Sequence, residues 1–307
     1  PPNPVLIGTH LATHTKTLRV GQNACILPDW HPIRLAEDLA MLDQITQGRL
    51  DVGIARGVNT RASIQFNVNA DRRDQQKNYA LFEETLEILM KAWTKDAFTH
   101  NGEFYTFPEP GWKEPAPRLY ADDPSHYGPD GELIALGVSP KPYQKPHPPI
   151  WQSADATKSY AFAAEHGHAA TSARRSFEGL REAWTTYKEG ASRVSGRDIP
   201  MGQAANGQTL NLLKTVHIAD TQEQAEKEAR EAVNNSLSFS GGRKEGWARK
   251  GIVAANEELT NDDLNAEWFD FLQEKEIIWV GTPDYIAEKL DHLRSELNCQ
   301  HVTLWPN

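Results

Sequence analysis

Residues 18–57 read LRVGQNACILPDWHPIRLAEDLAMLDQITQGRLDVGIARG, and this stretch decides the fold. Leu18–Leu27 is a short apolar, β-branched run, which is typical of a strand buried on both faces. From Pro32 apolar residues recur at helical spacing until a glycine ends the helix, and Leu50–Ala55 then reads as a second buried strand. A strand, a crossover helix and a strand make a parallel βαβ unit.

The same alternation of strands and helices continues along the chain. Further strands are expected at Pro149–Ser153, His168–Ala173, Leu210–Ala219 and His301–Pro306. Further helices are expected at Pro4–Thr17, Thr157–His166 and Phe177–Val194, and a long helix that Asp71 or Asp74 could cap ends at about Trp93. Two more helices are expected to begin after the caps Thr221 and Thr282. Asn101-Gly102 within Thr99–Phe107 predicts a hairpin with a two-residue type I′ turn. Two irregular insertions are expected, at about 108–148 and about 240–275. The first is rich in proline, glycine and aromatic residues, which favours an ordered lid or covering arm.

Composition excludes several classes of function. The 307 residues, 39% of them hydrophobic, suffice for one large core. A formal net charge of −10 argues against a nucleic-acid partner, because phosphate binding needs clustered Lys and Arg. No apolar run approaches the roughly 20 residues that span a bilayer. Cys25 and Cys299 are too few for a disulfide framework, so we expect reduced thiols in a cytoplasmic protein.

The sequence carries no motif for independent covalent or metal catalysis. It has no Gly-x-Ser-x-Gly elbow, no phosphate loop with Lys-Ser/Thr and no His-Glu-x-x-His. His166 and His168 flank a predicted helix end, where capping of the helix dipole is favoured over a metal pair. An enzyme without such motifs borrows its chemistry from a cofactor. We therefore expect no metal site.

One turn could bind an anion. Trp151–Ser159 joins a predicted strand to a helix start, where backbone N–H groups and the helix dipole favour a phosphate. Small residues there would let a ligand approach the backbone closely. From the residues alone, an ordinary capped helix start is the favoured explanation of this turn.

Several blocks together resemble the bacterial luciferase-like flavin monooxygenases. The first block, within 27–57, contains the motifs LP, HP, LAED, LD, GR and G-x-x-RG in that order. The other blocks are Leu81–Trp93, Phe98–Phe107, Pro149–Gly167 and Val280–Leu293. The blocks occur in the right order over most of the chain, and they are specific for the superfamily more than for any one member. The resemblance implies an α/β fold, a (β/α)8 TIM barrel, with residues 1–307 as a single domain. About six strand–helix repeats are visible, so we expect a fragment that lacks the first strands and the last helix.

The resemblance also assigns residues to the flavin. Asp155, Ala156 and Ser159 occupy the positions that hold the flavin phosphate, with Ala156 in place of a serine. Arg56 matches a phosphate-facing arginine. Tyr79 stands where luciferase has a second arginine, and its hydroxyl could bind phosphate, with Arg72 and Arg73 as nearby substitutes.

Asn23 and Ala24 match a pair joined by a non-prolyl cis peptide beneath the flavin ring. Ala55 replaces a reactive cysteine of luciferase, so that thiol is not used here. The catalytic residue stays unknown, because the family's active-site histidine is expected before Pro1.

The resemblance implies an FMN-dependent monooxygenase. Reduced FMN comes from a separate flavin reductase, O2 reacts with it, and one oxygen atom enters a small organic substrate, whose identity the sequence does not specify. The family pairs its barrels, which predicts a homodimer. Two alternatives stay open: a deazaflavin (F420)-dependent hydride-transfer enzyme on the same fold, and a non-catalytic flavin-binding or structural relative.

Overall fold

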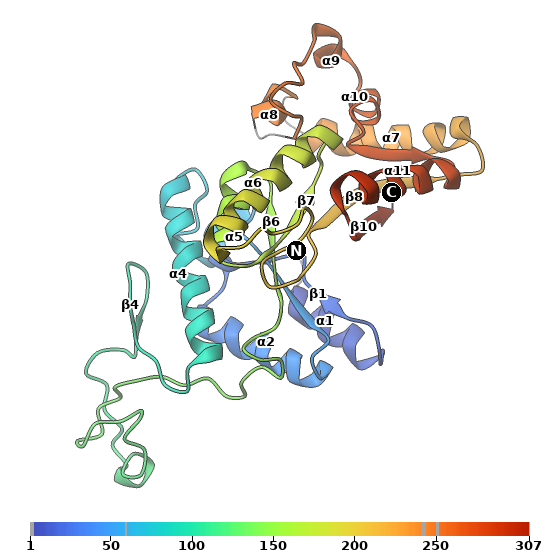
Figure 1. Ribbon diagram of the computed structural model, residues 1–307. Coiled ribbons are helices and arrows are strands. Elements are labelled where there is room, and N and C mark those ends of the chain that lie inside the picture. Colours follow the sequence, from blue (N-terminus) through green and yellow to red (C-terminus); the bar gives the residue numbers. More distant parts are fainter. Residues whose placement is uncertain (1–2, 59, 241–243, 250–251, 307) are drawn as a thin grey trace. The chain divides into compact units, whose positions relative to one another are not determined.

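The computed structural model describes residues 3–58, 60–240, 244–249 and 252–306. By its internal contacts the chain divides into two compact units, Pro1–Ile150 and Trp151–Asn307. In each unit parallel strands alternate with helices (Figure 1), as the sequence predicts for an α/β fold. Each unit is described by itself below.

The first unit begins with the predicted βαβ pattern. Its elements are α1 (Pro4–Thr13), β1 (Val20–Gly21), β2 (Cys25–Ile26), the 3-10 turn η1 (Leu27–Asp29), α2 (Pro32–Thr46) and β3 (Leu50–Ala55). Both β1 and β2 pair in parallel with β3, with Val20 opposite Leu50 and Cys25 opposite Ile54. The predicted continuous strand over Leu18–Leu27 is therefore wrong. The backbone of residues 22–24 leaves the ladder between the two short strands.

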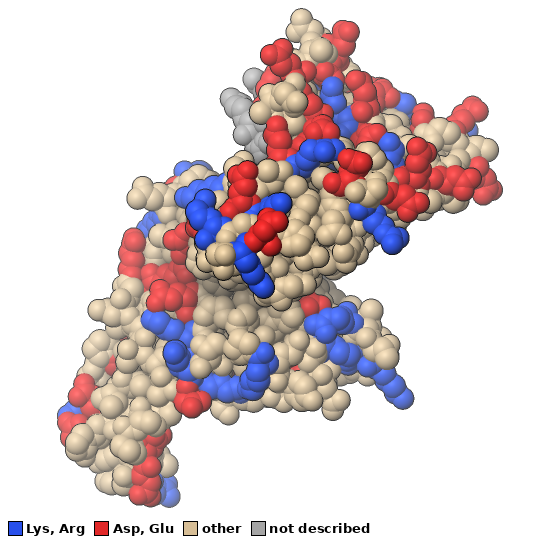
Figure 2. Space-filling view, in the orientation of Figure 1, with Lys and Arg blue, Asp and Glu red and all other residues tan. Residues whose placement is uncertain are grey.

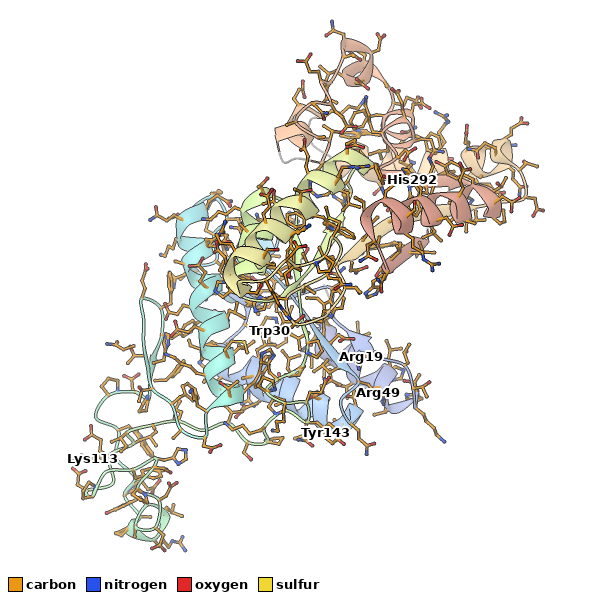
Figure 3. The ribbon with its side chains drawn as sticks, in the orientation of Figure 1. Arg19, Trp30, Arg49, Lys113, Tyr143 and His292 are labelled. Carbon is orange, nitrogen blue, oxygen red and sulfur yellow. The ribbon has the colours of Figure 1, made fainter. Side chains whose placement is uncertain are left out.

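Two arginines fasten the amino-terminal ends of these strands (Figure 3). Arg19 forms a two-pronged ion pair with Asp51, with both N–O distances at 2.8 Å. Arg49 donates to the carbonyl of Leu18 at 2.6 Å and to that of Ala12, the latter on α1, at 3.2 Å. Their guanidinium groups satisfy carbonyls that the short strands leave outside the ladder.

The remainder of the first unit packs around a long helix. It comprises α3 (Thr60–Phe66), α4 (Gln75–Thr94), β4 (His100–Asn101), β5 (Thr106–Phe107) and the 3-10 turn η2 (Pro117–Leu119). Asp74, one of two acids suited to the position, caps α4 by accepting from the Lys77 amide at 3.0 Å. Leu81, Leu89 and Trp93 of α4 are buried in the core.

The insertion at 108–148 is irregular, as predicted. Isolated bridges such as Lys113 to Glu132 hold it together. Its last part is anchored beside the amino-terminal end of β3, where Gln144 donates from its backbone to Asp43 and from its side chain to the Leu50 carbonyl, both at 2.8 Å. That is the end of β3 opposite to Arg56. Polar contacts hold this part of the insertion at that edge, and the role of the whole insertion as a lid or covering arm stays a prediction.

The second unit holds a parallel sheet of five strands. They are β6 (Ile150–Ala154), β7 (Ala169–Ala173), β8 (Asn211–Ile218), β9 (Ile278–Gly281) and β10 (His301–Pro306). β6 pairs with β7, and β8 pairs with β7, β9 and β10. β6, β7, β8 and β10 reproduce the predicted strands to within one residue at each end, whereas β9 was not predicted.

The helices of the second unit supply its core. They are α5 (Thr157–Glu165), α6 (Phe177–Ser195), α7 (Gln222–Ser240), α8 (Lys244–Arg249), α9 (Asn261–Asn265), α10 (Trp268–Glu274) and α11 (Pro283–Leu297). Thr282 caps α11 as predicted, accepting from the Tyr285 amide at 3.2 Å. α8 to α10 fall in the predicted second insertion at about 240–275, of which residues 241–243 and 250–251 lie outside the described residues. Acidic side chains gather over α7 (Figure 2), among them Glu223 and Glu231.

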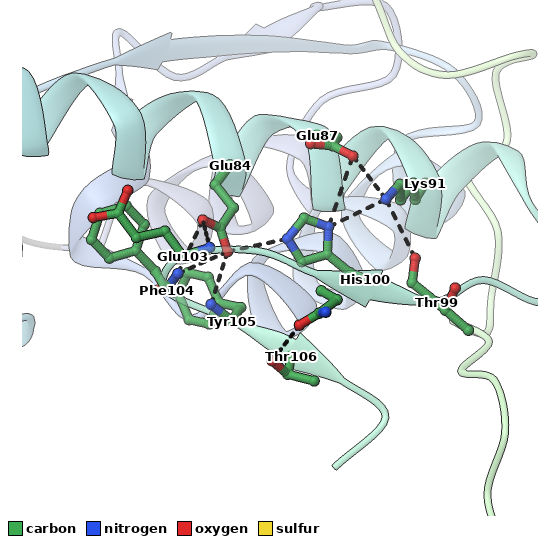
Figure 4. A network of polar contacts seen from close by, with 10 residues as sticks. Glu84, Glu87, Lys91, Thr99, His100, Glu103, Phe104, Tyr105 and Thr106 are labelled. Atoms are coloured by element: carbon green, nitrogen blue, oxygen red, sulfur yellow. Dashed lines mark hydrogen bonds and ion pairs between the residues drawn. The ribbon is translucent and has the colours of Figure 1, made fainter. Parts of the chain in front are cut away.

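The hairpin in the first unit differs from its prediction. β4 pairs with β5 through His100–Phe107 and Asn101–Thr106, so the loop is the four residues 102–105 and not the two-residue Asn101-Gly102 turn. Glu84 of α4 determines this shape (Figure 4). Its carboxylate accepts from the amides of residues 103, 104 and 105 at 2.8–3.1 Å and from His100 Nε2 at 3.1 Å. A Cβ on Gly102 would lie 2.3 Å from Glu84 Oε1, so a side chain at this position would displace the carboxylate from its hydrogen bonds.

We expect Glu84→Ala to release the hairpin from α4. A carboxylate that accepts several amide hydrogen bonds contributes more than a neutral acceptor, so the loss should cost about 2 kcal/mol. Hydrogen exchange of the amides of 103–105 should accelerate and the melting temperature should fall. Glu83→Ala, which removes an exposed neighbour on the same helix, is the matched control. Unchanged exchange at 103–105 in Glu84→Ala would contradict this account.

Candidate functional site

The Asn23–Ala24 peptide bond is cis, the conformation that the resemblance implies. It lies between β1 and β2, where the backbone bulges toward β3. A Cβ built on Gly53 would stand 1.6 Å from the Gln22 carbonyl oxygen, so Gly53 leaves the space that this bulge occupies. Gly53 was not among the residues predicted from the sequence to form the site. A glycine inside a strand pattern is, however, a known signal of close backbone approach.

Arg56 leaves the carboxyl end of β3 and is half-buried. Its guanidinium lies 4.6 Å from the centre of the Tyr79 ring, and its Nη1 donates to Gln75 Oε1 at 3.3 Å. Burial lowers the pKa of Arg56. Tyr79 lies on α4 with its hydroxyl buried, and it meets Arg56 through its ring face. Stacking on an aromatic ring leaves the guanidinium edge available to an anion.

The two substitutes considered for the second arginine have other contacts. Arg72 donates to the carbonyl of Gly57 and so holds the end of β3. Arg73 is exposed and forms an ion pair with Asp71 at 2.6 Å. Arg56 combines partial burial with a supporting aromatic ring.

In the second unit, residues 155–159 form the turn from β6 into α5. Ala156 is the N-cap residue of α5, and no side chain caps the helix through it. The Ser159 amide donates back to the Ala156 carbonyl at 2.8 Å, while the Asp155 side chain is exposed. The Asp155 carbonyl accepts from Arg175 Nη2 at 2.7 Å. An uncapped helix start made of small residues fits a bound phosphate.

The predicted residues fall into two groups. The first unit brings together Arg56 and Tyr79 and carries the Asn23–Ala24 peptide, and the second unit brings together Asp155, Ala156 and Ser159. Among the described residues, no three His, Cys, Asp or Glu side chains are grouped to hold a metal ion. No helix in the described part of the chain combines the length and apolarity needed to cross a membrane. Cys25 and Cys299 are buried free thiols.

A family model for luciferase-like monooxygenases matches residues 1–297. The chain belongs to that family. It is 28% identical over 272 residues to the oxygenase component of the flavin-dependent trigonelline monooxygenase of Acinetobacter baylyi, an alignment that covers 87% of this chain and 64% of that protein. It is 26% identical over 305 residues to 3,6-diketocamphane 1,6-monooxygenase of Pseudomonas putida, covering 95% of this chain and 74% of that protein.

A solved structure shares the fold. The oxygenating constituent of 3,6-diketocamphane monooxygenase of Pseudomonas putida, in complex with FMN, superposes with a TM-score of 0.72 at 23% identity, over 99% of this chain and 77% of that one. The predicted luciferase-like α/β fold is thus confirmed. The chain spans 64% of the length of the trigonelline enzyme, so the activity of the whole protein is taken up below as a proposal.

We expect Gly53→Ala to displace the backbone of residues 22–24. The new methyl group would meet a backbone carbonyl, which cannot rotate away as a side chain does, so unfolding should become easier by about 3 kcal/mol. Thermal and urea unfolding measure this. Gly246→Ala, which adds a methyl group with no atom within 4 Å, is the control. Equal stability of the two variants would show that the bulge does not depend on Gly53.

Proposed function

We propose that the protein is the oxygenase component of a two-component, FMN-dependent monooxygenase. The family match over residues 1–297 carries this proposal, together with relatives whose names specify flavin-dependent and FMN-binding monooxygenases. A flavin reductase would supply reduced FMN, and O2 and a small organic substrate would be the other reactants. The fuller architecture, a (β/α)8 barrel in which residues 1–307 form one domain, belongs to the same proposal. So does a cytoplasmic location, which keeps Cys25 and Cys299 as thiols.

The resemblance assigns phosphate-binding residues within each unit, and each set is taken by itself. Arg56 offers a guanidinium edge while the Tyr79 ring supports its face. Asp155, Ala156 and Ser159 shape a helix start whose amide groups are suited to phosphate oxygens. When bound, reduced FMN supplies the reaction with O2, and the protein orients it and limits access of water.

The peptide between Asn23 and Ala24 would support the flavin ring. Its cis geometry and the approach of Gln22 to Gly53 push the backbone out of the ladder. A backbone surface without bulky side chains suits a flat ring, because ring and peptide can approach to van der Waals distance. Asn23 and Ala24 are therefore assigned to cofactor binding.

Anaerobic titration tests the cofactor. We expect reduced FMN to bind more tightly than oxidised FMN or a deazaflavin, and we expect exposure to O2 to release hydrogen peroxide more slowly than free reduced FMN does. Arg56→Met should weaken binding of reduced FMN roughly tenfold, because it removes a charged hydrogen bond to phosphate. It should leave reduced riboflavin, which lacks the phosphate, unaffected.

Arg34→Met is the matched control for charge, since Arg34 is exposed on α2 and pairs with Glu37. Preferential binding of deazaflavin without oxygen reactivity would move the assignment to hydride transfer. Binding of no flavin would indicate a non-catalytic relative.

We also propose a homodimer, formed through α1 and α2. These helices expose an apolar set on the first unit, namely Leu6, Ile7, Leu11, Met41 and Ile45, each between 43% and 68% exposed. An apolar patch of this kind is uncommon on the surface of a monomer. A second copy of the chain is the occupant that the family's pairing of barrels favours.

Sedimentation equilibrium tests the dimer. Leu11→Asp should convert the dimer to a monomer, because an aspartate in a desolvated apolar interface would have no partner. Val194→Asp, on an equally exposed apolar position of α6, should leave the dimer intact. A wild-type monomer at micromolar concentration, or a dimer that survives Leu11→Asp, would overturn the proposal.

A further inference from the structure

Arg175 is an arginine buried beneath the surface of the second unit. It follows β7, and it is only 2% exposed to solvent. Nε donates to the Tyr160 hydroxyl at 3.0 Å, Nη1 to the Gly179 carbonyl at 3.3 Å and Nη2 to the Asp155 carbonyl at 2.7 Å. Burial of a guanidinium is costly unless several hydrogen bonds compensate it, and this one makes contacts on all three nitrogens.

The contact with Asp155 determines the direction of the next amide group. The Asp155–Ala156 peptide is trans, and in a trans peptide the C=O and N–H bonds point in opposite directions. Because Arg175 holds the carbonyl on the buried side, the Ala156 N–H is directed to the other side of the turn. Ala156 is the N-cap residue of α5, so this amide belongs to the uncapped helix start.

The position of Arg175 is itself fixed by a network. The Tyr160 hydroxyl donates to Ser172 Oγ at 2.8 Å, and Trp184 Nε1 donates to the same oxygen at 2.9 Å. The Lys214 ammonium donates to the backbone carbonyl of Arg175 at 2.7 Å. Tyr160 stands in the first turn of α5, so the network connects the helix, the sheet and the turn. A rigid support of this kind is what a preorganised binding turn requires.

We propose that Arg175 is a positioning residue for the phosphate of the flavin: it acts through the Asp155 carbonyl to fix the Ala156 amide, and it adds a buried positive charge behind the turn. This inference rests on the proposed function. Arg175 itself does not touch the ligand. A positioning role affects only the binding of the phosphate end of the cofactor, whereas general support of the fold would affect the binding of every part of it.

The experiment measures binding of two ligands that differ by the phosphate. Affinities for reduced FMN and reduced riboflavin are determined under anaerobic conditions for the wild type, Arg175→Met, Arg175→Lys and Tyr160→Phe, with melting temperatures recorded for each. Arg175→Met removes the charge and all donors. Arg175→Lys keeps the charge but loses the fork. Tyr160→Phe keeps Arg175 and removes one of its anchors.

We expect Arg175→Met to weaken FMN binding roughly 10- to 100-fold and riboflavin binding less than about twofold. Arg175→Lys should recover part of the FMN affinity, and Tyr160→Phe should lose about threefold. The phosphorus NMR signal of bound FMN should shift in all three variants. Arg193→Met, which removes an exposed arginine of α6 that pairs with Glu165 of α5, should match the wild type.

Equal loss of FMN and riboflavin affinity would overturn the positioning role, since it would show a general structural defect. Unchanged FMN affinity in Tyr160→Phe and Arg175→Lys would overturn it as well, even where Arg175→Met fails to fold. Wild-type protein that binds neither ligand would instead contradict the proposed function, and with it this inference.

Discussion

A backbone carbonyl packed where a side chain would otherwise stand is the constraint on which the first unit depends. The Gln22 carbonyl occupies the space that a Cβ of Gly53 would need. This contact lets residues 22–24 leave the ladder, which divides the expected strand into β1 and β2 and places the cis peptide between them. β3 itself keeps its full length, and Arg56 leaves its carboxyl end. One glycine thus permits both a regular strand and an irregular neighbour.

The backbone of the second unit is also held in an irregular conformation, but by a side chain, whereas Gly53 acts in the first unit by having no side chain. The turn at 155–159 is exposed at Asp155, Thr157 and Lys158, yet the peptide at its start is held from the buried side by Arg175. A turn held only by its own backbone would lose conformational entropy on binding an anion. A turn that is already held in place loses less. Because the hydrogen bonds of Arg175 already order the turn in the folded protein, the conformational entropy of the turn is lost on folding and not on binding of an anion.

The sequence predicts the regular elements well, because apolar periodicity and helix caps are local signals. β3 was predicted with its exact bounds, and Thr282 caps α11 as expected. The hairpin loop was mispredicted because Asn101-Gly102 suggests a local turn, whereas Glu84, distant in the sequence, binds the amides of a longer loop. Long-range polar contacts of this kind leave no periodic trace.

The candidate site divides in the same way. Arg56 and the turn at 155–159 were predicted because they follow strands and match family blocks. Arg175 was not, since an arginine just after a strand is ordinarily a surface residue. The structure gives the two arginines different means of acting. Arg56 is half-buried and stacks on Tyr79, so the edge of its guanidinium group is free to contact a ligand directly. The strength of that electrostatic interaction depends on how much water remains around the guanidinium group. Arg175 is enclosed, so its influence passes through one peptide group. In the first unit the Tyr79 ring thus supports the one charge that Arg56 carries, while in the second unit the charge of Arg175 stays behind the peptide that it holds.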